Sequence, residues 1–142
     1  MTGPVPDYAR HIRDAQASGL PGAPDTKSLT RLTDEDLRQR NGSTACPTRT
    51  NGHPRPTGYS CDEYPCRSTR EGAYTANLPD PPFPGRTFDW CQIPALPSGN
   101  GPDGWSACMI PEGRNSQGGS RLNSFYVNNR VIDKDPFYVE IL

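Results

Sequence analysis

The sequence predicts a small α+β domain stabilised by disulfide bonds, and three observations indicate this fold class. The chain has 142 residues, the length of one domain, and only 32% of them are hydrophobic. Its 17 prolines and 14 glycines require much of the backbone to form turns and loops. The apolar patterns occur in the order helices, then strands, then strand–helix–strand, which is typical of an α+β protein.

Two short helices are predicted in the N-terminal part of the chain, residues 1–45. The first covers Tyr8–Ala17, where the apolar side chains fall on one helical face and a glycine and a proline follow. The second covers Thr33–Gln39, because Thr33 is a suitable N-cap and three acidic residues follow it at the positive end of the helix dipole. Its expected buried residue is Leu37.

The remaining residues, 57–142, are expected to form the core of the domain. Alternation of apolar and polar residues, ended by turn-forming residues, predicts four strands, at 58–65, 87–92, 105–110 and 137–142. The main helix is expected over Asn115–Arg130, with the flexible pair Gly118-Gly119 at its entry. The proline-rich segment Asn77–Arg86 is expected to be an extended surface loop.

Five cysteines could supply covalent cross-links to a domain with so little apolar material. Because their number is odd, at least one of them is not paired within the chain. The preferred bridges are Cys91–Cys108 and Cys46–Cys61, with Cys66 free, although Cys66 could replace Cys61. The alternative is a cytosolic protein with five reduced cysteines.

The charge and hydropathy patterns limit the possible partners. A formal net charge of −1 argues against a protein that binds nucleic acid through its overall charge, although a nuclease needs only a locally positive groove. No apolar run approaches the length of a membrane-spanning helix. The first residues lack the apolar core of a signal peptide, so export would require a signal or delivery region from a longer chain.

Two polar motifs are candidates for chemistry. Asp62 and Glu63 end a predicted strand, where adjacent side chains point to opposite faces, so one can face a cleft as a general base or metal ligand. Asn115 begins the main helix, and its amide oxygen is a suitable ligand for Mg²⁺ or Mn²⁺. The alternatives are an exposed turn with solvated acids and a simple asparagine N-cap.

Arginines follow both motifs and suit the recognition of phosphate. They are Arg67, Arg70, Arg114, Arg121 and Arg130. The two histidines, His11 and His53, do not form a catalytic or metal-binding pattern. This argues against a histidine-based nuclease, a Ser-His-Asp hydrolase and a zinc peptidase.

Taken together, these motifs resemble the NucA/NucB deoxyribonuclease family. Residues 61–65, Cys-Asp-Glu-Tyr-Pro, are similar to the family's D-E-W/Y-P motif, and residues 114–119, Arg-Asn-Ser-Gln-Gly-Gly, are similar to its second motif. Weaker similarities extend over most of the chain, at residues 6–15, 71–73, 129–131 and 135–139. Cys66 departs from the family pattern, in which an apolar or aromatic residue is expected.

The resemblance implies a ββα-metal core of the His-Me finger type, in which aspartate replaces the usual catalytic histidine. It implies that Asp62 is the general base and that Asn115 binds one divalent ion, Mg²⁺ or Mn²⁺. Glu63 would support the metal or the strand.

The same resemblance implies that Arg114, Gln117 or Arg121 contacts the phosphates of a DNA substrate. The expected protein is a monomeric, secreted, metal-dependent endonuclease without membrane contact. If it is the toxin domain of a larger secreted protein, an immunity protein is its expected partner. The alternatives are an extracellular binding module stabilised by disulfides and an inactive nuclease-like domain.

Overall fold

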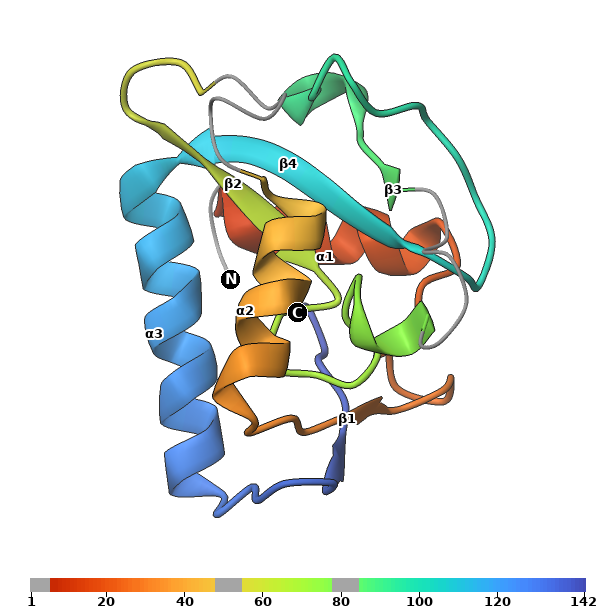
Figure 1. The fold of residues 1–142 in the computed structure, drawn as a ribbon, viewed down its shortest axis with the longest axis vertical. Coiled ribbons are helices and arrows are strands. Elements are labelled where there is room, and N and C mark those ends of the chain that lie inside the picture. Colours follow the sequence, from red (N-terminus) through yellow and green to blue (C-terminus); the bar gives the residue numbers. More distant parts are fainter. Residues whose placement is uncertain (1–5, 48–54, 78–84) are drawn as a thin grey trace.

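The computed structural model describes residues 6–47, 55–77 and 85–142, and within them it is an α+β protein (Figure 1). Its helices are α1 (Asp7–Ala17), α2 (Glu35–Ala45) and α3 (Glu112–Asn128). Its strands are β1 (Leu29–Thr30), β2 (Tyr59–Tyr64), β3 (Gly85–Arg86), β4 (Trp105–Pro111) and β5 (Pro136–Phe137). Two short 3₁₀ helices cover Thr75–Asn77 and Asp89–Cys91.

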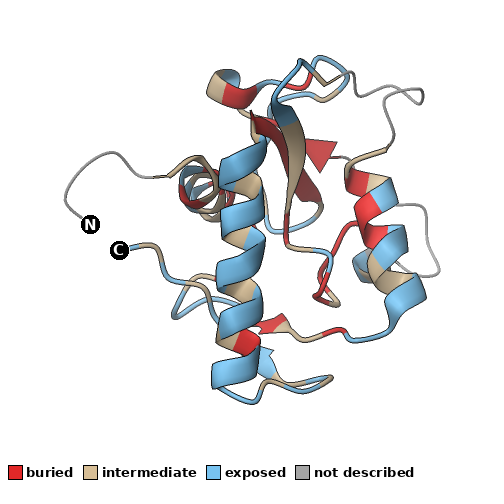
Figure 2. Ribbon diagram, turned by 90° about the vertical axis from the view of Figure 1, so that its left-hand side faces the viewer, coloured by how far each residue is buried: buried red, intermediate tan, exposed pale blue. Residues whose placement is uncertain are grey.

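The main sheet has the strand order β2-β4-β3, with β2 antiparallel and β3 parallel to the central strand β4. Helices α1 and α2 lie on opposite faces of this sheet, which Figures 1 and 2 show from two directions. Because both of its faces are covered, β4 is buried over nearly its whole length. A second, two-stranded sheet pairs β1 with β5 and thereby connects the segment between α1 and α2 to the C-terminal segment.

Helix α3 follows β4 directly and packs against both β2 and β4. Its position depends on Gly118, because a Cβ atom at this residue would lie 2.8 Å from the ring of Tyr8 on α1. The predicted flexible Gly-Gly pair is therefore a segment of regular helix, at which α1 approaches α3 closely. Asn115 lies inside the first turns of α3 and not at the N-cap, which is Pro111.

The second predicted helix was placed too early and made too short. Asp34, and not Thr33, is the N-cap of α2, and its side chain accepts a hydrogen bond from the backbone N–H of Leu37 at 2.9 Å. The helix continues to Ala45 because Asn41 and Gly42 are buried against the segment that follows β2. Tertiary contacts thus extend α2 into residues whose intrinsic helix propensity is poor.

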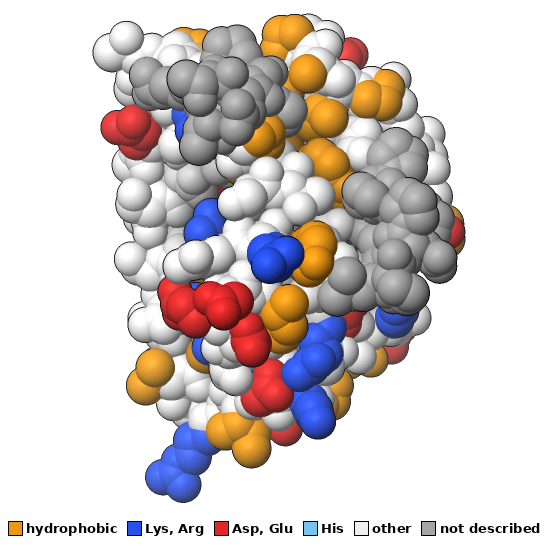
Figure 3. Space-filling view, in the orientation of Figure 1, with side chains coloured by type: hydrophobic (Ala, Val, Ile, Leu, Met, Phe, Trp, Pro, Cys, Tyr) orange, Lys and Arg blue, Asp and Glu red, His pale blue; other side chains and the backbone are white. Residues whose placement is uncertain are grey.

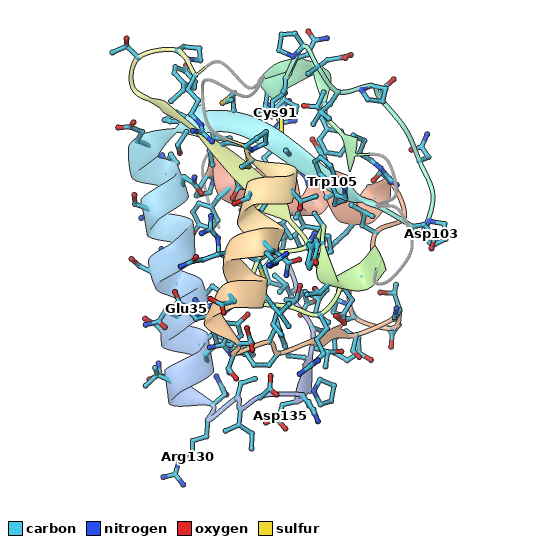
Figure 4. The ribbon with its side chains drawn as sticks, in the orientation of Figure 1. Glu35, Cys91, Asp103, Trp105, Arg130 and Asp135 are labelled. Atoms are coloured by element: carbon cyan, nitrogen blue, oxygen red, sulfur yellow. A yellow bond between two sulfur atoms is a disulfide. The ribbon has the colours of Figure 1, made fainter. Side chains whose placement is uncertain are left out.

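The strand predicted over residues 87–92 is wrong. Strand β3 lies earlier, at Gly85–Arg86, and a 3₁₀ turn follows it, with the backbone N–H of Cys91 donating to the carbonyl of Phe88 at 3.1 Å. A Cβ atom on Gly85 would lie 2.3 Å from the Trp105 ring, so the β3–β4 contact requires glycine there (Figure 4). Of the predicted C-terminal strand, only Phe137 belongs to a strand. Most of the predicted loop 77–86 lies outside the described residues.

Both preferred disulfide bonds are confirmed. Cys46 is bonded to Cys61 and Cys91 is bonded to Cys108, and Cys66 is a free thiol. The first bond connects the end of α2 to β2, and the second connects the 3₁₀ turn to β4. Among the described helices, none combines the length and the apolar character needed to cross a membrane.

Candidate functional site

A cavity of about 780 Å³ lies beside β2, and it receives side chains from all three helices. Asp62 and Glu63 of β2 line this cavity together with Asn115 of α3. The two predicted motifs, which are more than fifty residues apart in the sequence, therefore share one site. The elements that bring them together are an antiparallel strand pair, β2 and β4, and the helix that follows it.

The hydrogen bonds of Asn115 define which way its amide group points. Its Nδ2 donates to the Oγ of Ser60 at 2.7 Å and to the backbone carbonyl of Cys61 at 3.2 Å. Because a carbonyl can only accept, the nitrogen must face β2. The Oδ1 oxygen makes no hydrogen bond with the described residues. Ser60 and Asp62 are two positions apart on the strand and share a face, so Asn115 contacts β2 on the side that carries Asp62.

Asp62 is the acid that faces α1. Its Oδ2 lies 2.6 Å from the Nδ1 of His11, and the Nε2 of His11 lies 2.8 Å from the Oγ of Ser106 on β4. His11 and Ser106 are fully buried, whereas 18% of the Asp62 side chain is exposed. The carboxylate is therefore the only one of these three groups that lines the cavity.

Glu63 points to the opposite face of β2, toward α2, as expected for the residue adjacent to Asp62. Its Oε1 accepts a hydrogen bond from the Nε of Arg67 at 2.9 Å, and the Arg67 guanidinium packs over Gly42 of α2. The second oxygen, Oε2, is buried and has no hydrogen-bond partner among the described residues. Burial raises the pKa of Glu63, and the positive charge of Arg67 offsets this increase only in part.

The predicted phosphate-binding residues do not all lie in this cavity. Arg121 lines it, but Arg114 and Gln117 line a separate pocket on the exposed side of α3 and contact each other at 3.4 Å. Arg130 follows the end of α3 and points away from the molecule (Figure 4). Arg70 pairs with Asp133 outside the cavity.

Among the described residues, four arginines line the cavity, and the sequence motifs indicated only two of them. They are Arg31, Arg38, Arg67 and Arg121. The acids of the described lining are Asp62, Glu63 and Glu140, so the arginines outnumber them by one. On the face shown in Figure 3, acidic side chains form one group, with basic side chains beside it. Arg67 is paired with Glu63 and Arg38 with Glu35, so Arg31 and Arg121 are the arginines of this lining that have no ion pair among the described residues.

Three charged side chains that line the cavity each have a polar atom without a hydrogen-bond partner among the described residues. The buried Nε atoms of Arg31 and Arg38, like the Oε2 of Glu63, have no partner among the described residues. Arg31 stacks over the Tyr126 ring at 3.9 Å, which fixes its guanidinium plane at the cavity. This part of the cavity lining is therefore suited to bind an additional anionic or polar group.

His11 and Ser106 belong to the site but were not identified from the sequence. A signal for His11 was present, because it precedes the buried Ala15 by one helical turn and therefore lies on the inner face of α1. A histidine on a buried face requires hydrogen-bond partners. Ser106 carried no such signal, because it is one of several small residues in an apolar strand.

Cys66 also lines the cavity, and its environment predicts an unreactive thiol. Burial raises its pKa to about 11, so the thiolate is scarce at neutral pH. We expect iodoacetamide to alkylate native Cys66 at pH 8 about 100-fold more slowly than a thiol of ordinary pKa, with a rate that rises about tenfold per pH unit. Mass spectrometry of the unreduced protein measures this rate, and the same protein in urea is the control. Equal rates in the two samples would contradict the prediction.

Within the part of the chain that the structure describes, no group of three or more His, Cys, Asp or Glu side chains is arranged to hold a metal ion. A metal at this site would therefore have few protein ligands and would keep several waters, which is the usual coordination of Mg²⁺. The predicted amide ligand, Asn115, is compatible with such coordination.

Comparisons with known proteins add no relative to this description. No protein-family model, no curated protein and no solved structure matches the chain. The resemblance of the Asp62–Glu63 and Asn115 motifs to the NucA/NucB family therefore stays a prediction from sequence.

Proposed function

We propose that this chain is a metal-dependent endonuclease that hydrolyses the phosphodiester bonds of DNA. The observation that carries the proposal is that Asp62 and Asn115, from β2 and α3, line one cavity together with four arginines. A carboxylate can accept the proton of a water molecule, and the arginines can bind the phosphates on either side of the reacting one. The β2-β4-α3 arrangement is compatible with a ββα-metal core of the His-Me finger type.

The donor atoms at the site fit a hard divalent ion, Mg²⁺ or Mn²⁺. Asn115 is oriented by two hydrogen bonds through its nitrogen, which leaves its Oδ1 oxygen available as a neutral ligand. Glu63 lies on the opposite face of β2, toward α2, so its proposed role is to support the strand through its hydrogen bond with Arg67. When bound, the ion supplies positive charge against the charge that develops on the phosphate.

The residues of the chain perform the other steps. Asp62 uses the carboxylate oxygen that faces the cavity to accept the proton of the attacking water. Arg38, Arg67 and Arg121 fix the substrate strand through bonds to its phosphate oxygens, which orients the reacting phosphate. Arg114 and Gln117, in the separate pocket of α3, are then contacts for a more distant part of the substrate.

Two disulfide bonds are compatible with an extracellular protein, and secretion is part of the proposal. The enzyme is then either a free monomeric deoxyribonuclease or the toxin domain of a larger secreted protein. In the second case an immunity protein is its partner, and it has to cover the cavity in order to block the substrate.

Nicking of supercoiled plasmid DNA tests the proposal. We expect cleavage with Mg²⁺ or Mn²⁺, none with excess EDTA, and recovery when the metal is restored. Asn115→Ala should reduce cleavage at least about 100-fold, because even residues that only orient a metal ligand contribute 10- to 100-fold. The matched control is Asn128→Ala, an exposed asparagine on the same helix.

The outcomes separate the competing functions. Cleavage that persists in EDTA would contradict a metal-dependent mechanism. Binding of DNA that weakens with salt, without any cleavage, would instead support an inactive nuclease-like domain. A protein that neither binds nor cuts DNA would favour the extracellular binding module. Melting temperatures of all variants show whether a loss of activity reflects a loss of folding.

A further inference from the structure

The hydrogen-bonded chain Asp62–His11–Ser106 connects three elements beneath the cavity. It runs from β2 through α1 to β4, with separations of 2.6 Å and 2.8 Å. The residues at its two contacts are 51 and 95 positions apart in the sequence. The ring of His11 is also packed edge-on against Phe88 at 6.0 Å between centroids, so its orientation is set on several sides.

This chain has the members of a Ser-His-Asp hydrolase triad but the opposite orientation. In such a hydrolase the serine meets the substrate and the carboxylate lies beneath the histidine. Here the Ser106 side chain is fully buried on the central strand, and the carboxylate is the group at the cavity. Ser106 cannot reach a substrate, so the histidine does not activate a nucleophilic serine.

The hydrogen-bonding roles of the three groups follow from an ionised Asp62. A carboxylate only accepts hydrogen bonds, so the Nδ1 of His11 is the donor in this pair. Ser106 can satisfy Nε2 in either protonation state of the ring, because its hydroxyl donates to Nε2 or accepts from it. When it accepts, its own proton has a second acceptor in the carbonyl of Tyr64, at 3.3 Å.

We infer that His11 is a positioning residue for Asp62 and that Ser106 sets the orientation of its ring. The inference rests on the proposed function, in which Asp62 accepts a proton. His11 binds the Oδ2 of Asp62 and thereby directs the other oxygen, Oδ1, which has no partner among the described residues, into the cavity. A base held in this way needs no reorientation when the water reacts.

Two substitutions of His11 separate this role from a general need for a polar buried residue. An asparagine at position 11 places its side-chain N–H₂ near the position of Nδ1, where it can donate to Asp62. A glutamine reaches instead toward the position of Nε2 and Ser106, and it leaves Asp62 without this donor. Both variants retain a neutral amide in the core, so they differ chiefly in the atom that they contact.

We expect His11→Gln to lower kcat about 10- to 100-fold with little change in KM, since orienting residues have effects of this size. His11→Asn should recover a large part of that loss. Ser106→Ala should have a smaller effect, because the bond to Asp62 remains. The assay uses a short DNA duplex at saturating Mg²⁺, and melting temperatures identify any variant that does not fold.

The result that would overturn the inference is equal kcat for wild type and His11→Gln in a preparation whose Asp62→Asn variant is inactive. If wild type itself does not cleave DNA, the proposed function fails, and NMR still tests the contact. His53→Gln leaves His11 as the only histidine. In the ¹⁵N-labelled His53→Gln protein, the Nδ1–H of His11 should give a strongly downfield proton signal, and adding Asp62→Ala should abolish it. Absence of that signal in the parent protein would contradict the hydrogen bond on which the inference depends.

Discussion

Replacement of Asp62 by asparagine is expected to reduce metal-dependent DNA cleavage at least about 1000-fold, near the upper range of general-base contributions. The amide has nearly the same shape as the carboxylate and can still accept the hydrogen bond from His11. It cannot accept the proton of the attacking water at neutral pH. The substitution therefore removes the chemistry and preserves the packing of β2 against α1.

Initial rates on a supercoiled plasmid, together with kcat and KM on a short duplex, measure this effect. Asp89→Asn is the control, because Asp89 is an exposed acid of the 3₁₀ turn outside the cavity. We expect the control to cleave at the wild-type rate. An Asp62→Asn protein that folds and retains more than a tenth of the wild-type kcat would exclude Asp62 as the base. Glu63 would then be the next acid of the motif to test.

Replacement of Asn41 by alanine is expected to reduce the free energy of unfolding by about 4 kcal/mol. Expressed as a free energy, this effect is comparable to the loss of cleavage expected for Asp62→Asn. Asn41 is almost fully buried on α2. Its Nδ2 donates to the carbonyls of Arg67 and Thr69, and its Oδ1 accepts from the backbone N–H groups of Tyr74 and Thr75. Alanine would leave the carbonyl of Arg67 and the N–H groups of Tyr74 and Thr75 without this partner, whereas the carbonyl of Thr69 keeps its bond from the N–H of Gly72.

Urea unfolding followed by circular dichroism measures this loss, and Asn128→Ala is the exposed control, for which a change below about 0.5 kcal/mol is expected. The loss should also reduce activity, because Asn41 holds the backbone of Arg67, whose side chain is bonded to Glu63. A loss of less than about 1 kcal/mol would show that the segment after β2 is held mainly by other contacts.

Elements with a local signal in the sequence were predicted accurately, and elements that depend on contacts between distant residues were not. Helix α1 and strands β2 and β4 were predicted within one or two residues, because their apolar patterns and the turn residues beside them are local features. The start of α3 was missed by one turn, since Pro111 and Gly113 are typical turn residues in the local sequence. Strand β3 was displaced because its position depends on the contact of Gly85 with Trp105, which no local pattern shows.

The candidate site was predicted in its polar motifs but not in their surroundings. Asp62, Glu63 and Asn115 are conspicuous in the sequence, and the cavity brings them together. Arg114 and Arg121 look equivalent in the sequence, yet only Arg121 lines the cavity, because the packing of α3 against β2 directs one side of the helix outward. Arg31, which directly follows β1, and Arg38 of α2 reach the site through the folding of distant segments.

By itself, the sequence determined the α+β class and the acids of β2, since composition and local pattern carry that information. It favoured the two disulfide pairs, but the choice of Cys61 over Cys66 as the partner of Cys46 came from the structure. The tertiary structure alone decided that His11 and Ser106 lie behind Asp62 and that two of four arginines come from unsuspected segments. The physical reason is that a buried polar group is defined by its partners. Those partners are contributed by other elements of the fold, and no local pattern records them.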